Sequence, residues 1–181
     1  MPDVQQAWQV LHGAELICTE AQIQQALKRL AGEITSELQE TFPLVLSVMG
    51  GAVVFTGQLL PLLKFPLDFD YLHVTRYRGG TRGGEVQWKV GPHSDIRKRL
   101  VLILDDVLDE GETLAAIREK LLAGGAGQVK TAVFVDKALG RKKPIEADFV
   151  GLSLPNRYLF GFGMDINEAW RNLPAIYANK D

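Results

Sequence analysis

The spacing of apolar residues along the chain alternates between a helical period and short continuous runs. Between positions 19 and 38 apolar residues recur every three or four places, which predicts an amphipathic helix. Thr19 and Gln22 have the spacing of a capping box and predict where this helix begins. The continuous apolar runs predict strands buried on both faces, at 44–49, 100–104, 129–135 and 149–154.

Further elements fit the same alternation of strand and helix. Helical spacing returns after Gly50 and Gly51 and again from Thr113, while residues 67–74 and 85–90 have the pattern of strands. Strands that alternate with helices are typical of an α/β protein. We therefore expect one domain over the 181 residues, built on a twisted, mainly parallel sheet flanked by helices.

Composition narrows the class of protein. Hydrophobic residues make up 46% of the chain, and 20 basic residues nearly balance 22 acidic ones. A net charge of −2 without a long basic block argues against nucleic acid as a partner. The single cysteine, Cys18, excludes an internal disulfide and a zinc site built from cysteines. No apolar stretch approaches the roughly 18 residues of a membrane span, and no signal peptide is evident, so we expect a cytoplasmic protein without a membrane partner.

The run from 100 to 113 carries the most chemistry. Asp105 and Asp106 follow an apolar strand, Asp109 comes shortly after them, and Gly111 precedes a predicted helix. Ligands of open α/β sheets bind at the carboxyl ends of the strands. Carboxylates there can take sugar hydroxyls or a metal, and the N–H groups of a glycine loop and helix start bind phosphate. The run predicts a site for a phosphorylated sugar.

The same run, VLILDDVLDEGET, resembles the signature of the type I phosphoribosyltransferases, whose substrate is phosphoribosyl pyrophosphate (PRPP). The resemblance implies that family's fold, with a core at about 35–150 and a small hood at about 151–181 joined by part of the N-terminus. It also implies Mg²⁺ as cofactor. Asp105 and Asp106 would bind ribose hydroxyls and the metal, and Asp109 would be catalytic, taking the purine N7 proton.

The phosphate-binding loop implied by the resemblance consists of Glu110, Gly111, Glu112 and Thr113. Glu110 departs from the signature, which has Thr or Ser at that place. Because a carboxylate beside a phosphate repels it, we expect Glu110 to point outward. Phosphate binding is then left to backbone N–H groups and Thr113.

Two glycine-containing segments extend this hypothesis. Gly50 and Gly51 follow a strand and would let backbone N–H groups approach the pyrophosphate; the alternative is a simple tight turn. Residues 76–91 hold several glycines, arginines and Tyr77, which indicates a lid that excludes water from the reacting sugar. The alternative for this segment is a solvated hairpin loop.

The C-terminal part is similar to the hypoxanthine–guanine branch of the family. A proline, an aromatic residue and a Gly-aromatic-Gly-apolar-Asp motif follow the last predicted strand, with an arginine six residues later. The resemblance implies that Lys137 donates to the purine 6-oxo group. Tyr158 would stack on the purine ring, and Leu159 would offer its backbone carbonyl. Asp165 would hold the metal, and Arg171 would contact pyrophosphate.

The expected activity is therefore the joining of hypoxanthine or guanine to PRPP, giving IMP or GMP and pyrophosphate, in a homodimer or homotetramer. One alternative is a regulator that kept the fold and binds nucleic acid, which would need a large basic face. A second is a transferase that prefers xanthine. The basic run Arg141–Lys143 is expected to be a solvated turn.

Overall fold

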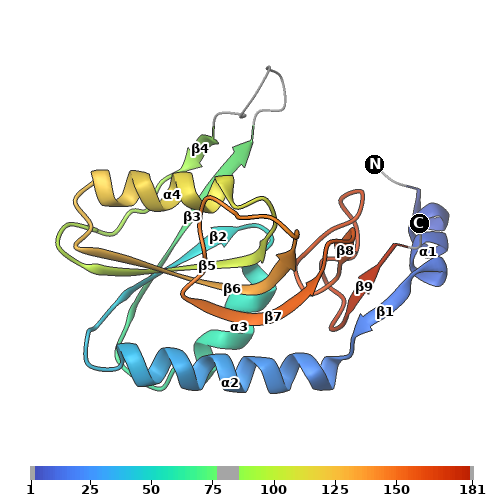
Figure 1. Cartoon of the computed structure of the whole chain (residues 1–181), viewed down its shortest axis with the longest axis horizontal. Coiled ribbons are helices and arrows are strands. Elements are labelled where there is room, and N and C mark those ends of the chain that lie inside the picture. Colours follow the sequence, from blue (N-terminus) through green and yellow to red (C-terminus); the bar gives the residue numbers. More distant parts are fainter. Residues whose placement is uncertain (1–2, 77–85, 180–181) are drawn as a thin grey trace.

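The computed structural model describes residues 3–76 and 86–179 and contains a six-stranded sheet with helices on both faces (Figure 1). The strand order is β4-β3-β2-β5-β6-β7, and every neighbouring pair is parallel except β4 with β3. The strands are β2 (Leu44–Met49), β3 (Asp68–Arg76), β4 (Val86–Val90), β5 (Leu100–Leu108), β6 (Gln128–Ala138) and β7 (Phe149–Pro155). The predicted α/β fold class is confirmed.

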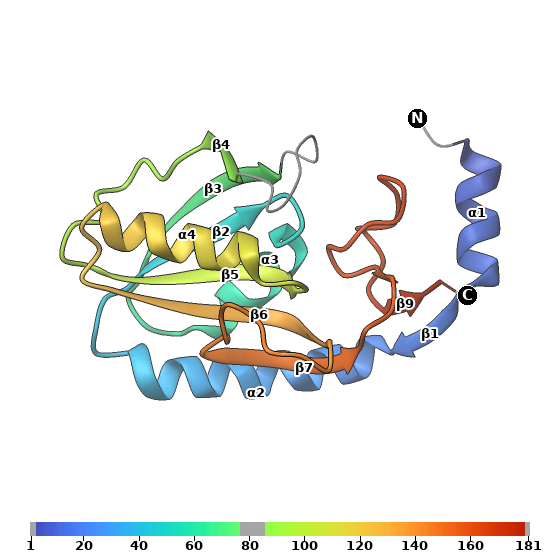
Figure 2. The ribbon, with the colours of Figure 1, turned by 45° about the horizontal axis from the view of Figure 1, so that its top comes forward.

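Helices cover both faces of this main sheet (Figures 1 and 2). α2 (Glu20–Leu38) and α3 (Val53–Leu59), with the 3-10 turn η1 (Leu60–Leu62), lie on one face, and α4 (Glu112–Ala123) lies on the other. The capping box of α2 is present, since the Thr19 N–H donates to Gln22 Oε1 at 2.8 Å. Among the described helices, none is long and apolar enough to cross a membrane.

The apolar stripe predicted for α2 is the face that holds this helix to the sheet. Ile23, Leu27 and Leu30 are fully buried and belong to one core cluster with Phe55 of α3 and Phe134 of β6. Each such side chain contributes about 1.5–3 kcal/mol when it leaves water. Periodic burial of this kind explains why the sequence pattern predicted α2 well.

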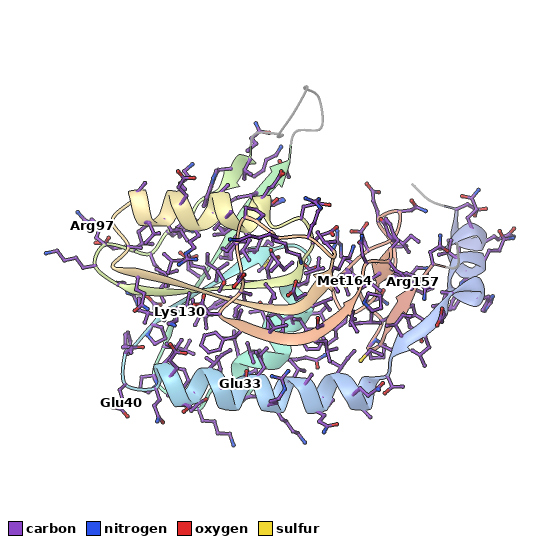
Figure 3. All side chains as sticks on the ribbon, in the orientation of Figure 1. Glu33, Glu40, Arg97, Lys130, Arg157 and Met164 are labelled. Carbon is purple, nitrogen blue, oxygen red and sulfur yellow. The ribbon has the colours of Figure 1, made fainter. Side chains whose placement is uncertain are left out.

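A second, three-stranded antiparallel sheet lies beyond the carboxyl ends of β5, β6 and β7 (Figures 1 and 2). It is called the hood sheet below and consists of β1 (Glu15–Cys18), β9 (Ile176–Ala178) and β8 (Leu159–Phe160), in that order. Arg157, labelled in Figure 3, pairs with Glu15 at 2.7 Å and so ties the N-terminal strand to the C-terminal segment.

The N-terminal helix α1 (Val4–Gly13) packs beside the hood sheet, and the sequence pattern did not predict it. None of its residues is buried, and although Val4, Trp8 and Leu11 recur at helical spacing, this short segment was not assigned as a helix. α1 is held instead through Trp170, whose Nε1–H donates to Ala7 O at 2.9 Å and whose ring contacts Trp8 edge to face.

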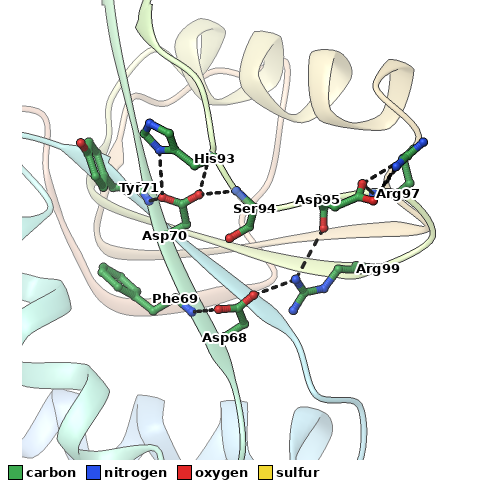
Figure 4. Close-up of polar contacts among 9 residues, drawn as sticks. All are labelled: Asp68, Phe69, Asp70, Tyr71, His93, Ser94, Asp95, Arg97 and Arg99. Carbon is green, nitrogen blue, oxygen red and sulfur yellow. Dashed lines mark hydrogen bonds and ion pairs between the residues drawn. The ribbon is translucent and has the colours of Figure 1, made fainter.

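One buried carboxylate ties the loop after β4 to β3 (Figure 4). Asp70 is 8% exposed and accepts backbone N–H groups from His93 at 2.6 Å, Ser94 at 2.8 Å and Tyr71 at 2.8 Å. Burial by itself raises the pKa of Asp70, but these hydrogen bonds outweigh it and lower the pKa below its ordinary value. Asp70 is therefore a charged anchor for the loop.

We expect Asp70→Ala to lower the free energy of unfolding by about 2–4 kcal/mol, because three backbone N–H groups lose their acceptor. Since folding lowers the pKa of Asp70, its contribution is present above the ordinary aspartate pKa and is lost as the pH falls through the folded value. Urea denaturation at several pH values measures both effects. Glu33→Ala is the control, because Glu33 makes an exposed pair with Arg29 one helical turn away; an equal loss there would contradict the prediction.

Candidate active site

The acidic pair lies within β5 rather than after it. The sequence predicted a strand that ends at Leu104, but β5 continues to Leu108 and stays paired with β6 as far as Asp136. Two adjacent acids interrupt the apolar run, so the pattern hid the last part of the strand. Asp105 and Asp106 thus have the fixed backbone of a central strand.

Burial dominates the electrostatics of this pair. It raises the pKa of Asp105 well above the ordinary value, and the neighbouring charge of Asp106 raises it further. Burial also raises the pKa of Asp106, while a hydrogen bond with Asp105 and the positive charge of Arg171 oppose that rise. The two carboxyl groups therefore resist double ionisation. Hydroxyl donors or a cation would stabilise their charged form.

Glycines allow the backbone to close around Asp106. A Cβ atom at Gly51 would overlap the Asp106 carboxylate. Gly163 has a φ of +101°, and a Cβ atom there would overlap the Gly51 carbonyl oxygen. The backbone at Gly51 therefore lies directly against the Asp106 side chain of β5 and against the loop that contains Gly163, with no space for a further side chain.

Two cavities meet at the carboxyl end of β5. The first, called the loop cavity, has a volume of about 270 Å³ and is lined among others by Gly51, Asp105 and Thr113. The second, called the hood cavity, has a volume of about 320 Å³ and reaches to β8. Asp106, Asp109 and Arg171 line both cavities, which therefore form one continuous site.

The start of α4 makes the wall of the loop cavity suitable for an anion. Gly111 is the N-cap in the left-handed conformation, with a φ of +84°, and no side chain caps the helix. The first N–H groups of a helix have no partner inside it, and the positive end of the helix dipole lies there. Glu110, Gly111 and Thr113 line the cavity, and Glu112 is the first residue of α4. This geometry suits a phosphate.

The hood cavity brings together most of the residues expected to contact a purine. Lys137 lies in β6 rather than after it, and its Nζ is 3.2 Å from Asp109 Oδ2. Tyr158 is 57% exposed, and both it and the buried Leu159 line the cavity. One donor and one acceptor thus lie side by side next to an aromatic ring.

Arg171 connects the hood to the acidic pair. Its Nη2 pairs with Asp165 Oδ1 at 2.6 Å, and its Nη1 donates to Gly163 O at 2.7 Å. Met164, labelled in Figure 3, lies in the same loop and lines the hood cavity. Tyr77 and most of the predicted lid at 76–91 fall outside the described residues.

Two basic residues that the sequence analysis assigned to a solvated turn instead contact the site. The Arg141 guanidinium donates to the Glu110 carboxylate, which therefore has a partner. Lys143 Nζ donates to Leu108 O at 2.7 Å and pairs with Asp136 Oδ1 at 2.5 Å. The prediction of a solvated turn was wrong for Lys143, whose side chain is only 10% exposed. No local pattern signals such contacts.

The donor set suits a hard cation that brings ligands of its own. Among residues 3–76 and 86–179, no three His, Cys, Asp or Glu side chains gather as a metal site. The loop cavity does hold the adjacent carboxylates of Asp105 and Asp106. Mg²⁺ is commonly bound by one or two carboxylates, with waters and substrate phosphates completing its shell, so these residues fit it.

Comparison with known proteins agrees with the geometry. The phosphoribosyl transferase domain family matches residues 17–168. A hypoxanthine-guanine phosphoribosyltransferase from Bacillus subtilis is 36% identical over 163 residues, which are 90% of this chain and 91% of the relative. The bifunctional protein TilS/HprT of Listeria innocua is 35% identical over 90% of this chain, which spans 25% of that longer protein. A crystal structure of a hypoxanthine phosphoribosyltransferase from Staphylococcus aureus has a TM-score of 0.88 and 31% identity, covering 99% of this chain and 96% of that one.

We expect Asp105→Asn to raise the free energy of unfolding by about 1–3 kcal/mol at about pH 8, because it removes a charge that burial disfavours. The folded pKa of Asp105 is raised, so the penalty is absent below the ordinary aspartate pKa and grows as the pH rises toward the folded value. Thermal unfolding of the wild type and the variant in metal-free buffer, at several pH values from below the ordinary aspartate pKa up to about pH 8, measures this difference. Asp109→Asn is the control, since Asp109 is half-exposed and paired; stabilisation of both variants alike, or no gain with pH, would contradict this account.

Proposed function

This chain belongs to the phosphoribosyl transferase family, and we propose that it is the purine salvage transferase that joins hypoxanthine or guanine to PRPP, giving IMP or GMP and pyrophosphate. The observation that carries the proposal is the meeting of the loop cavity and the hood cavity at Asp106, Asp109 and Arg171. A transferase must hold its two substrates with the reacting atoms in contact. Two joined cavities, one suited to phosphates and one to a flat base, meet that requirement.

PRPP occupies the loop cavity in this proposal. The backbone N–H groups at the start of α4 and the Thr113 hydroxyl bind the 5-phosphate, while Glu110, Gly111 and Glu112 supply the loop. Asp105 and Asp106 accept hydrogen bonds from the ribose hydroxyls, which supports their ionised form.

In this proposal the pyrophosphate group lies between the hood and the end of β2. The backbone of Gly50 and Gly51 approaches it closely because neither residue has a side chain. Arg171 supplies the positive charge, and it is already held beside the acidic pair by Gly163 O. A planar guanidinium can bind two oxygens of one phosphoryl group.

The purine occupies the hood cavity. Its N7 and 6-oxo positions lie on one edge, and Asp109 and Lys137 offer that edge an acceptor and a donor whose side chains are neighbours. Tyr158 covers the ring, and the backbone carbonyl of Leu159 accepts from the 2-amino group of guanine.

In the reaction, purine N9 forms a bond to the anomeric carbon while the bond from that carbon to pyrophosphate breaks. The proton on N7 passes to the Asp109 carboxylate, so the purine of the product nucleotide is neutral, and pyrophosphate is the leaving group. Positive charge develops on the sugar, and the carboxylates of Asp105, Asp106 and Asp109 surround the place where it forms. Positioning and electrostatic stabilisation supply most of the rate.

Mg²⁺ belongs to the proposal as a cofactor. When bound, it neutralises the pyrophosphate leaving group and orients the ribose hydroxyls. Asp105 and Asp106 would hold it in the loop cavity. Asp165 would contribute through a water, since its carboxylate already accepts from the Glu168 N–H at 2.9 Å and pairs with Arg171.

A homodimer or homotetramer is the assembly we propose. Phe69 and Tyr71 are alternate residues of β3 on one face, and they are 41% and 39% exposed. Exposed apolar side chains that gather on a sheet face favour association. Sedimentation velocity distinguishes such an assembly from a monomer.

The choice of base tests the proposed function. Pyrophosphate release from PRPP and Mg²⁺ should be efficient with hypoxanthine and guanine, and kcat/KM for adenine should be lower by on the order of 10⁴. Adenine presents a 6-amino donor to the donor Lys137, which leaves polar groups unpaired in a closed site. Lys137→Ala should lower kcat/KM about 100-fold with both 6-oxo bases. Lys142→Ala, an exposed neighbour, is the control. A kcat/KM for adenine equal to that for hypoxanthine would overturn the assignment, and so would a lack of activity with every purine. Xanthine is included among the bases to test its use.

The role of Asp109 is tested separately. We expect Asp109→Asn to lower kcat about 100-fold with little change in the KM for PRPP, because it removes the acceptor of the N7 proton in the transition state. Asp106→Asn is the comparison, and there the KM for PRPP should rise. Steady-state kinetics with hypoxanthine separate the two. Near-normal turnover by Asp109→Asn would rule out the acid–base role.

A further inference from the structure

The segment 141–145, which connects β6 to β7, packs against the loop that leads from β5 to α4. The Lys143 ammonium donates to Leu108 O at 2.7 Å. A Cβ atom at Gly111 would lie 3.3 Å from Ile145 Cγ2, so the glycine lets Ile145 approach the loop. Ile145 itself is 6% exposed. The segment is therefore held against the loop that lines the loop cavity, on the side away from the cavity lining.

Glu110 sets an electrostatic problem for that cavity. Glu110 is one of the residues that line the loop cavity, and it directly precedes Gly111, the N-cap of the helix whose N–H groups bind phosphate in the proposed function. A carboxylate about 5 Å from a phosphate weakens binding by about 10–100-fold through charge repulsion at a partly solvated site. The site needs a cation that offsets this charge.

Arg141 is that cation. Its guanidinium donates to the Glu110 carboxylate, and among the described residues it is the one ion-pair partner of Glu110. The two side chains are 64% and 42% exposed, so solvent screens the pair in part and the fold does not depend on it. The contact joins residues 31 positions apart in the chain. Its effect is therefore on the charge of the cavity more than on stability.

We propose that Arg141 is a positioning residue for PRPP affinity: it holds the Glu110 carboxylate against segment 141–145 and cancels the charge that would repel the phosphate. The inference rests on the proposed function, because it takes the loop cavity as the PRPP site. Arg141 acts through Glu110 and touches no reacting atom. Its removal weakens PRPP binding only while position 110 is charged.

The test is a double-mutant cycle on four proteins: the wild type, Arg141→Ala, Glu110→Gln and the double variant. At saturating hypoxanthine, Arg141→Ala should raise the KM for PRPP about tenfold and leave kcat within about twofold. In the Glu110→Gln background the same change should raise KM less than about twofold. Raising the salt concentration to about 0.5 M should shrink the effect of Arg141→Ala, which loss of packing would not do. Lys142→Ala, from the same basic run, should match the wild type.

Calorimetric titration of PRPP into the same four proteins separates this inference from the proposed function. The dissociation constant for PRPP should change among the four proteins in the same way as the KM, whether or not the protein uses a purine. An unchanged affinity in Arg141→Ala overturns the inference, and so does an equal loss in both backgrounds, which would mean that Arg141 contacts the phosphate itself. A wild type that binds PRPP but forms no purine nucleotide overturns the proposed base specificity alone. A wild type that does not bind PRPP overturns both.

Discussion

The placement of two adjacent, half-buried carboxyl groups within β5 is the constraint on which the rest of the site depends. Burial and the charge of Asp106 disfavour ionisation of Asp105, so small or positively charged groups fit best against the pair. Gly51 satisfies the first condition because its missing Cβ leaves space for the Asp106 carboxylate. Arg171 satisfies the second. In the proposed function, ribose hydroxyls and a cation would stabilise this destabilised pair when substrate binds, which is a usual exchange of stability for function.

The same logic explains how a site rich in acids can bind a polyanion. Among the described residues, the ion pairs of the site are Lys137–Asp109, Arg171–Asp165 and Arg141–Glu110, and none includes the β5 pair. Asp109, Asp165 and Glu110 are thus each already paired with a positive charge. In the proposed function, substrate binding would exchange partners within the site instead of bringing new charges together. The β5 pair is therefore the part of the site where a bound cation would lower the free energy most.

The sequence predicted those parts that are encoded locally. The capping box and stripe of α2, the loop before α4 and the glycine at 51 all follow from residues within a few positions of one another. The second half of β5 was missed because charged residues do not have the pattern of a buried strand. The contact of Arg141 with Glu110 was missed for a different reason: it joins two loops through the fold, and side chains that meet in this way leave no periodic trace.

The hood cavity depends on both ends of the chain. β1 pairs with β9, and β9 with β8, so one wall of this cavity forms only when residues near position 15 meet residues near position 178. Arg171 belongs to this late-assembled part, yet it lines both cavities and lies next to Trp170, which holds α1. The central sheet therefore supplies the acidic pair and the phosphate loop by itself. Completing the hood cavity requires the non-local contacts of the hood, which meets the central part at Arg171 and where Gly163 lies against Gly51.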